Sequence, residues 1–148
     1  MVKISPVSSL TKIGDANGYN LSSLLPNTIE TPGARKLREL IIGTEKDTPN
    51  EKLTQITVNS NTLLEKLYVG NLTAYTNDLN LKGCTSLKEV NALGSTFTAV
   101  SLSDGCPIEI LEIQNPTSLS LSNLYNLKKL TIKDTSRLAS LDFNNIDS

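Results

Sequence analysis

Few residues of this chain carry the chemistry that catalysis or metal binding requires. The 148 residues include no His and only two Cys, Cys84 and Cys106. Without His, the chain can form neither a Ser-His-Asp triad nor an imidazole metal site, and two thiols cannot by themselves complete a zinc site. No pair of carboxylates is spaced for acid–base catalysis, and no Gly-rich phosphate loop is present. We therefore expect a protein that is not an enzyme and that binds no cofactor and no metal ion.

The composition also argues against several classes of partner. The net charge is −1 and 20% of the residues are charged, whereas proteins that bind nucleic acid through its phosphates are usually basic. No apolar stretch approaches the roughly 18 residues of a membrane span, and residues 1–6 lack the apolar core of a signal peptide. We expect no nucleic-acid partner, no membrane insertion and no signal peptide in this chain.

Residues 37 to 143 carry an internal repeat instead. Its unit is an apolar residue, two other residues, a second apolar residue, one other residue and a third apolar residue. Of the aligned positions, only Thr76 and Pro116 are not apolar. The copies are Leu37/Leu40/Ile42, Leu53/Ile56/Val58, Leu64/Leu67/Val69, Thr76/Leu79/Leu81, Leu87/Val90/Ala92, Phe97/Val100/Leu102, Ile108/Leu111/Ile113, Pro116/Leu119/Leu121, Leu127/Leu130/Ile132 and Leu138/Leu141/Phe143.

A residue that favours tight turns follows each unit, two positions after its last apolar residue. Asn, Asp and Gly tolerate left-handed backbone angles, so each unit predicts a short β-strand followed by a corner. Two units are needed to complete one coil, which gives a period of about 19 to 23 residues. The turn residues are Thr44, Ser60, Asn71, Gly83, Gly94, Asp104, Asn115, Asn123, Asp134 and Asn145.

This pattern predicts parallel strands, stacked apolar ladders and little helix after residue 36. One ladder should consist of Leu67, Val90, Leu111 and Leu130, and the facing ladder of Ile56, Leu79, Val100, Leu119 and Leu141. The charged loop 44–52 should project from the coil as an exposed turn. The strands are expected near residues 55–58, 66–69, 79–81, 89–92, 99–102, 110–113, 119–121, 129–132 and 140–143.

Cys84 and Cys106 occupy the same position of successive coils, so they should lie one above the other. Parallel neighbours are about 4.8 Å apart, which makes a disulfide geometrically conceivable. The alternative, which we favour, is two buried thiols that pack as small apolar residues.

Several segments resemble known leucine-rich repeats. Residues 83–90 (GCTSLKEV), 106–111 (CPIEIL) and 127–132 (LKKLTI) resemble irregular leucine-rich repeats of the BspA-like type. Residues 34–43 (ARKLRELIIG) and 63–71 (LLEKLYVGN) resemble leucine-rich-repeat segments of large tail-associated proteins of gut bacteriophages. The resemblance implies a repeat solenoid, a right-handed leucine-rich-repeat-like coil of short parallel β-strands that is mainly β. It also implies a part in interactions at a virion or cell surface, and it supplies no catalytic residues.

The outward strand positions predict two different faces. One row is mostly small and neutral, and its candidate binding residues are Thr57, Asn80, Ser101, Ser120 and Asp142. The other row is more charged, and its candidates are Tyr68, Asn91, Glu112 and Thr131. The first row suits a glycan, which hydroxyls and amides can bind, and the second suits a protein. A solvated surface without a ligand is the alternative for each row.

The expected function is a non-enzymatic module for protein or cell-surface glycan interaction, or for structure, in a phage tail or other surface assembly. The alternatives are a fragment of a secreted bacterial cell-surface adhesin and, less favoured, a β-helix carbohydrate-active enzyme. The expected location is accordingly the virion or the bacterial cell surface.

The expected organisation is an irregular N-terminal lead-in or cap over residues 1–36, followed by the solenoid over residues 37–148 as part of a longer chain. No polar cap follows the last apolar residues, Leu138, Leu141 and Phe143. We therefore expect self-association through the C-terminal coil, or further repeats in the parent protein.

Overall fold

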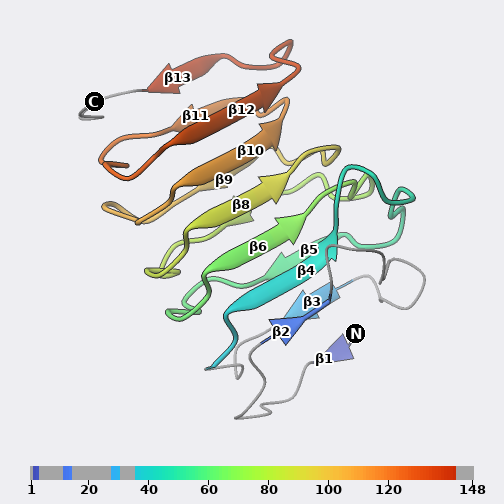
Figure 1. The fold of residues 1–148 in the computed structure, drawn as a ribbon. Helices are drawn as coiled ribbons and strands as arrows, with labels where there is room; N and C mark the ends of the chain where they lie inside the picture. Colours follow the sequence, from blue (N-terminus) through green and yellow to red (C-terminus); the bar gives the residue numbers. More distant parts are fainter. Residues whose placement is uncertain (1, 4–11, 15–27, 31–35, 143–148) are drawn as a thin grey trace.

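The computed structural model of the protein is a β-solenoid of short parallel strands (Figure 1). It describes residues 2–3, 12–14, 28–30 and 36–142, and this part of the chain contains no helix, hence none that could cross a membrane. The predicted mainly-β repeat solenoid is therefore confirmed. The strands are β1 (Val2–Lys3), β2 (Lys12–Ile13), β3 (Thr28–Glu30), β4 (Glu39–Gly43), β5 (Gln55–Thr57), β6 (Lys66–Val69), β7 (Leu79–Asn80), β8 (Glu89–Ala92), β9 (Ala99–Ser101), β10 (Ile110–Gln114), β11 (Ser118–Ser120), β12 (Lys129–Lys133) and β13 (Ser140–Asp142).

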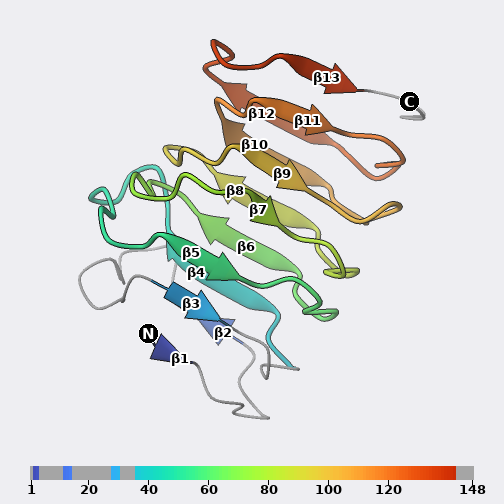
Figure 2. The same cartoon turned by 180° about the vertical axis from the view of Figure 1, so that it is seen from behind.

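The strands form two layers that face each other across the core. The even-numbered strands β2 to β12 form one six-stranded sheet, and the odd-numbered strands form a sheet of β1, β3 and β5 and another of β7, β9, β11 and β13. Strands β4 to β12 of the first layer run opposite to strands β5 to β13 of the second (Figures 1 and 2). We call the outer surface of the six-stranded sheet the even face and the outer surface of the other two sheets the odd face.

The strand register produces the first predicted apolar ladder in full and the second without Ile56. Leu67 pairs with Val90, Val90 with Leu111 and Leu111 with Leu130. In the other layer, Leu79, Val100, Leu119 and Leu141 pair in the same way. Because side chains alternate between the two sides of a strand, one inward residue in each strand is enough to build a continuous ladder through the core.

Most predicted corner residues adopt the left-handed backbone conformation. Positive φ angles are found at Ser60, Asn71, Gly83, Gly94, Asn115, Asn123 and Asp134. Asp104 lies in a turn as predicted, but the positive φ of 66° falls on the neighbouring Gly105, which has no Cβ to oppose it. Thr44 is not among the positive-φ residues, since it enters the loop 44–52, where its N–H donates to Asp47 Oδ2. Asn145 lies outside the described residues.

The repeat alignment was also wrong at Thr76. Thr76 is exposed, and the preceding Tyr75 occupies the core with 1% of its surface exposed. The ring of Tyr75 packs edge-on against Phe97, with 4.7 Å between the ring centroids. An aromatic ring removes much more apolar surface from water than a threonine does, which accounts for the local shift of register.

The hydroxyl of Tyr75 takes the place of strand pairing at this point. The N–H of Ile56 donates to Tyr75 Oη at 3.3 Å, and the hydroxyl lies 3.3 Å from the carbonyl of Asp78. Strand β5 accordingly pairs with β3 and not with β7. In the strand register Ile56 pairs with Ile29, so the prediction that Ile56 belongs to the ladder of Leu79 was wrong. The odd layer is thus divided between β5 and β7.

The described parts of residues 1–36 also contribute strands to the solenoid. Strand β2 pairs with β4, and β1 and β3 extend the sheet that contains β5. The boundary at residue 36 stays a prediction, and Phe143 with the rest of the C-terminus lies outside the described residues. Near the C-terminal end, Leu141 is 36% exposed, and self-association through this coil stays a prediction as well.

Candidate binding faces

Two cavities lie on the described part of the odd face, and four of the five residues predicted for this row line them. Thr57 and Asn80 line a cavity of about 370 Å³ between β5 and β7. Ser101 and Ser120 line a second cavity of about 290 Å³ over β9 and β11. Asp142 does not line either cavity, and its carboxylate accepts a hydrogen bond from the hydroxyl of Ser122 at 3.0 Å.

The lining of both cavities is rich in hydroxyls and amides. The cavity over β9 and β11 presents Ser101, Ser103, Ser118, Ser120 and Ser122. The cavity between β5 and β7 presents four amide side chains, from Gln55, Asn59, Asn77 and Asn80. Asn59 and Asn77 belong to the corners next to these strands and were not among the predicted site residues. The sequence holds no signal for them, because only the division of the sheet at Tyr75 exposes them to a common space.

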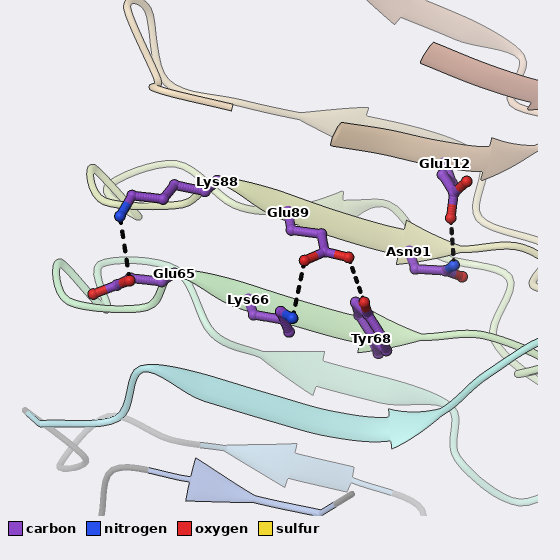
Figure 3. A network of polar contacts seen from close by, with 7 residues as sticks. All are labelled: Glu65, Lys66, Tyr68, Lys88, Glu89, Asn91 and Glu112. Carbon is purple, nitrogen blue, oxygen red and sulfur yellow. Dashed lines mark hydrogen bonds and ion pairs between the residues drawn. The ribbon is translucent and has the colours of Figure 1, made fainter. Parts of the chain in front are cut away.

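The even face is held together by contacts between neighbouring strands (Figure 3). Glu89 of β8 pairs with Lys66 at 3.0 Å and accepts a hydrogen bond from the hydroxyl of Tyr68, both on β6. Glu112 of β10 accepts a hydrogen bond from Asn91 at 2.6 Å.

Three of the four residues predicted for the even face therefore have partners in neighbouring strands. Tyr68, Asn91 and Glu112 take part in these contacts, and Glu112 also pairs with Lys129 of β12. Thr131 lies next to Glu112 in the strand register. Burial and the hydrogen bond to Glu89 raise the pKa of the Tyr68 hydroxyl, so this group stays protonated at neutral pH.

Opposite charges also alternate along the corner that precedes the even strands. Arg38, Glu65 and Lys88 occupy this position in three successive coils, and Glu65 pairs with both neighbours. Glu109 and Lys128 continue the series one and two coils further on, at 2.7 Å from each other. Hydrogen bonds from Arg38 and Lys88 lower the pKa of Glu65. Exposed ion pairs contribute little stability, so we infer that these pairs mainly fix the register between successive coils.

Most of the loop 44–52 is exposed, as predicted, but the loop also contacts the coils. Asn50 is buried, and its N–H donates to the carbonyl of Asn71 at 2.8 Å. Glu45 pairs with Lys133 of β12, which lies 88 residues further along the chain. The loop thereby borders a cavity of about 340 Å³ on the even face. Its lining residues are Thr44, Glu45, Lys46, Tyr68, Asn91, Leu93 and Glu112.

Cys84 and Cys106 are free, buried thiols, so the prediction of buried thiols is confirmed and no disulfide joins them. The thiol of Cys84 donates to the carbonyl of Val58 at 3.2 Å, and that of Cys106 to the carbonyl of Leu87 at 3.5 Å. Burial raises the pKa of both thiols above the usual value. Low access and a small thiolate fraction both disfavour reaction with electrophiles.

We predict that neither thiol reacts with a disulfide reagent such as DTNB while the protein is folded. In native buffer at pH 8, the rate at which the thiols react should be limited by the rate of unfolding. In 6 M guanidinium both thiols should react at once. The absorbance of the released thiolate measures this. Fast reaction of even one equivalent in native buffer would show that the Cys84–Cys106 corner opens without unfolding.

Comparison with known proteins does not assign the chain to a family. No protein-family model matches it, and neither the curated proteins nor the solved structures contain a significant match. The fold therefore rests on the strand pairing, and the likeness to leucine-rich repeats rests on the sequence segments quoted above.

Proposed function

We propose that the protein is a non-enzymatic binding module whose odd face holds an extended glycan, in a phage tail or another surface assembly. The observation that carries this proposal is the position of the two cavities on the odd face, at Thr57, Asn80, Ser101 and Ser120. Hydroxyls and amides both donate and accept hydrogen bonds, as sugar hydroxyls do, so they can exchange water for a sugar at little cost.

The even face suits this role less well, because its charged groups already satisfy one another. A ligand that covered Glu89 or Glu112 would have to remove water from existing ion pairs with Lys66 and Lys129. Desolvation of charges is costly unless the ligand replaces every lost interaction. We therefore propose that the charged groups of the even face mainly fix the register of the coils.

The solenoid also suits a polymer by its shape. The paired strands β7, β9, β11 and β13 of the odd face are about 4.8 Å apart, so similar groups recur at short intervals along this part of the solenoid axis. Individual contacts with sugar hydroxyls are weak, but several sites on one rigid face act together on one polymer chain.

We propose binding without catalysis because each cavity is lined by a single carboxylate, Asp78 in one and Asp104 in the other. Glycoside hydrolysis usually requires two carboxylates on opposite sides of the scissile bond. A fragment of a secreted bacterial adhesin would use the same face in the same way. Tail genes next to the parent gene would support a virion, and a secretion signal in the parent gene would support an adhesin.

The experiment is affinity electrophoresis of the protein in native gels that contain dextran, glycogen, peptidoglycan fragments or bacterial O-polysaccharide. We expect at least one of these polysaccharides to retard the protein. Ser120→Lys places a long charged side chain over the odd face and should abolish the retardation. Thr131→Lys makes the matched change on the even face and should preserve it. Equal loss in both variants, or no retardation by any polysaccharide, would contradict the proposal.

A further inference from the structure

The division between β5 and β7 is the most unusual feature of the odd face (Figure 2). Strands β7, β9, β11 and β13 pair continuously, whereas Tyr75 replaces the expected pairing of β7 with β5. The hydroxyl of Tyr75 satisfies the backbone of Ile56 and Asp78, so the strands can stand apart without unpaired polar groups at this point. The resulting opening is the cavity of about 370 Å³, near the lower end of the range of roughly 300–1,000 Å³ typical of small-molecule sites.

Several polar side chains at this opening have no hydrogen-bond partner within the described part of the chain. Among the described residues, the side chains of Gln55, Asn59 and Asp78 make no hydrogen bond, although all three line the cavity. By contrast, Ser120, Ser122 and Asp142 at the C-terminal end of the same face are joined in a continuous chain of hydrogen bonds. The opening therefore combines a defined volume with hydrogen-bonding groups that the fold leaves unused.

We propose that this opening is a subsite for one neutral, hydroxyl-rich sugar unit, an inference that rests on the proposed function. The carboxylate of Asp78 has two oxygens and can accept hydrogen bonds from the two hydroxyls of a vicinal diol. The amides of Gln55 and Asn59 can each donate to one sugar oxygen and accept from another hydroxyl.

The charges at the opening select against acidic sugars. Asp78 lines the cavity, and neither Lys nor Arg is among the lining residues. A uronic acid would therefore bring its carboxylate close to that of Asp78 with no cation to balance the two charges. The second cavity differs in this respect, because both Lys82 and Asp104 line it.

Binding at the opening should be weak and purely polar. The ring of Tyr75 is buried against Phe97, so it offers no exposed face on which a sugar could stack. We expect a dissociation constant on the order of 1 mM for a short oligosaccharide.

The test is a titration of the full 148-residue chain, labelled with ¹⁵N and followed by heteronuclear NMR. The probes are maltotetraose, cellotetraose and chitin tetrasaccharide as neutral sugars and tetragalacturonate as the acidic one. We expect at least one neutral probe to shift amide signals of residues 55–59 and 75–80, and tetragalacturonate to bind those residues at least about fivefold more weakly.

Two variants test the role of Asp78. Asp78→Asn keeps the shape of the side chain and should weaken binding of the neutral probe about 5- to 20-fold while it removes the preference over tetragalacturonate. Asp104→Asn makes the same change at the second cavity and should leave binding at residues 55–59 unaltered. Both side chains are exposed, so the variants should fold, which the dispersion of the NMR spectrum checks.

The outcomes separate this inference from the proposed function. Shifts confined to residues 99–104 and 118–122 would overturn the subsite and leave glycan binding by the odd face intact. Retardation by a polysaccharide in the gel, without shifts at residues 55–59 from any tetrasaccharide, would overturn the subsite in the same way. An Asp78→Asn variant with unchanged affinity and unchanged preference for neutral sugars would also overturn it. Absence of both retardation and shifts would overturn the two proposals together.

Discussion

Replacement of Leu111 by Ala is expected to lower the free energy of unfolding by about 2–5 kcal/mol. Leu111 has 0% of its surface exposed and lies between Val90 and Leu130 in the ladder of the six-stranded sheet. Its truncation removes apolar burial and leaves a cavity that the coils above and below cannot easily fill, because strand pairing holds their spacing. Urea denaturation followed by circular dichroism measures the change.

Leu141→Ala is the matched control for this prediction. Leu141 has the corresponding inward position in β13, the last strand of its sheet, but 36% of its surface is exposed, so less burial is lost and water can enter the space. We expect its effect to be less than half of that of Leu111→Ala. If Leu111→Ala changed the stability by only a few tenths of a kcal/mol, the core position of Leu111 would be wrong.

Replacement of Gly83 by Ala is expected to destabilise the protein clearly more than replacement of Gly105 by Ala. Both glycines have a positive φ, 82° and 66°, and the left-handed conformation costs an L-residue roughly 1–2 kcal/mol. A Cβ on Gly83 would also lie 2.9 Å from Cα and 3.0 Å from N of Ser60, in the corner of the preceding coil, whereas a Cβ on Gly105 meets no atom within 4 Å.

The difference in destabilisation between Gly83→Ala and Gly105→Ala isolates the effect of the contact between stacked corners. Gly83→Ala must displace the backbone of Ser60, which adds on the order of 1–3 kcal/mol to the conformational cost. The same denaturation experiment measures both variants, and Gly105→Ala serves as the control for the cost of φ alone. Equal effects would show that the corners at Ser60 and Gly83 can separate freely and that their close stacking does not hold the coils together.

The repeating part of the fold was predictable from the sequence because it depends on short-range order. The alternation of side chains along a strand places Leu67, Val90, Leu111 and Leu130 inward in successive coils, and pairing of coils with the same pattern then stacks them. Corner residues such as Asn71 and Asn115 were predictable for the same reason, since their own chemistry permits the left-handed conformation. The polar character of the odd face follows from the same alternation.

Departures from the repeat were not predictable, because a residue's neighbours in space decided them. The pattern alone could not tell that Tyr75 would displace Thr76 from the core, since that choice depends on the contact with Phe97. Either Tyr75 or Thr76 in the core keeps the strand pattern intact, so only packing of complete side chains separates the two alternatives.

The amino-acid sequence by itself thus determined the coil, its two ladders and the contrast between its faces, because a periodic pattern of apolar residues can be buried only in a periodic structure. Tertiary structure decided where that periodicity is broken. The opening between β5 and β7 exists because the hydroxyl of Tyr75 reaches the backbone of Ile56, and Glu45 meets Lys133 across 88 residues of chain. No local sequence pattern relates the residues that these contacts join. The contacts therefore contribute to the free energy of folding only once the coils have stacked.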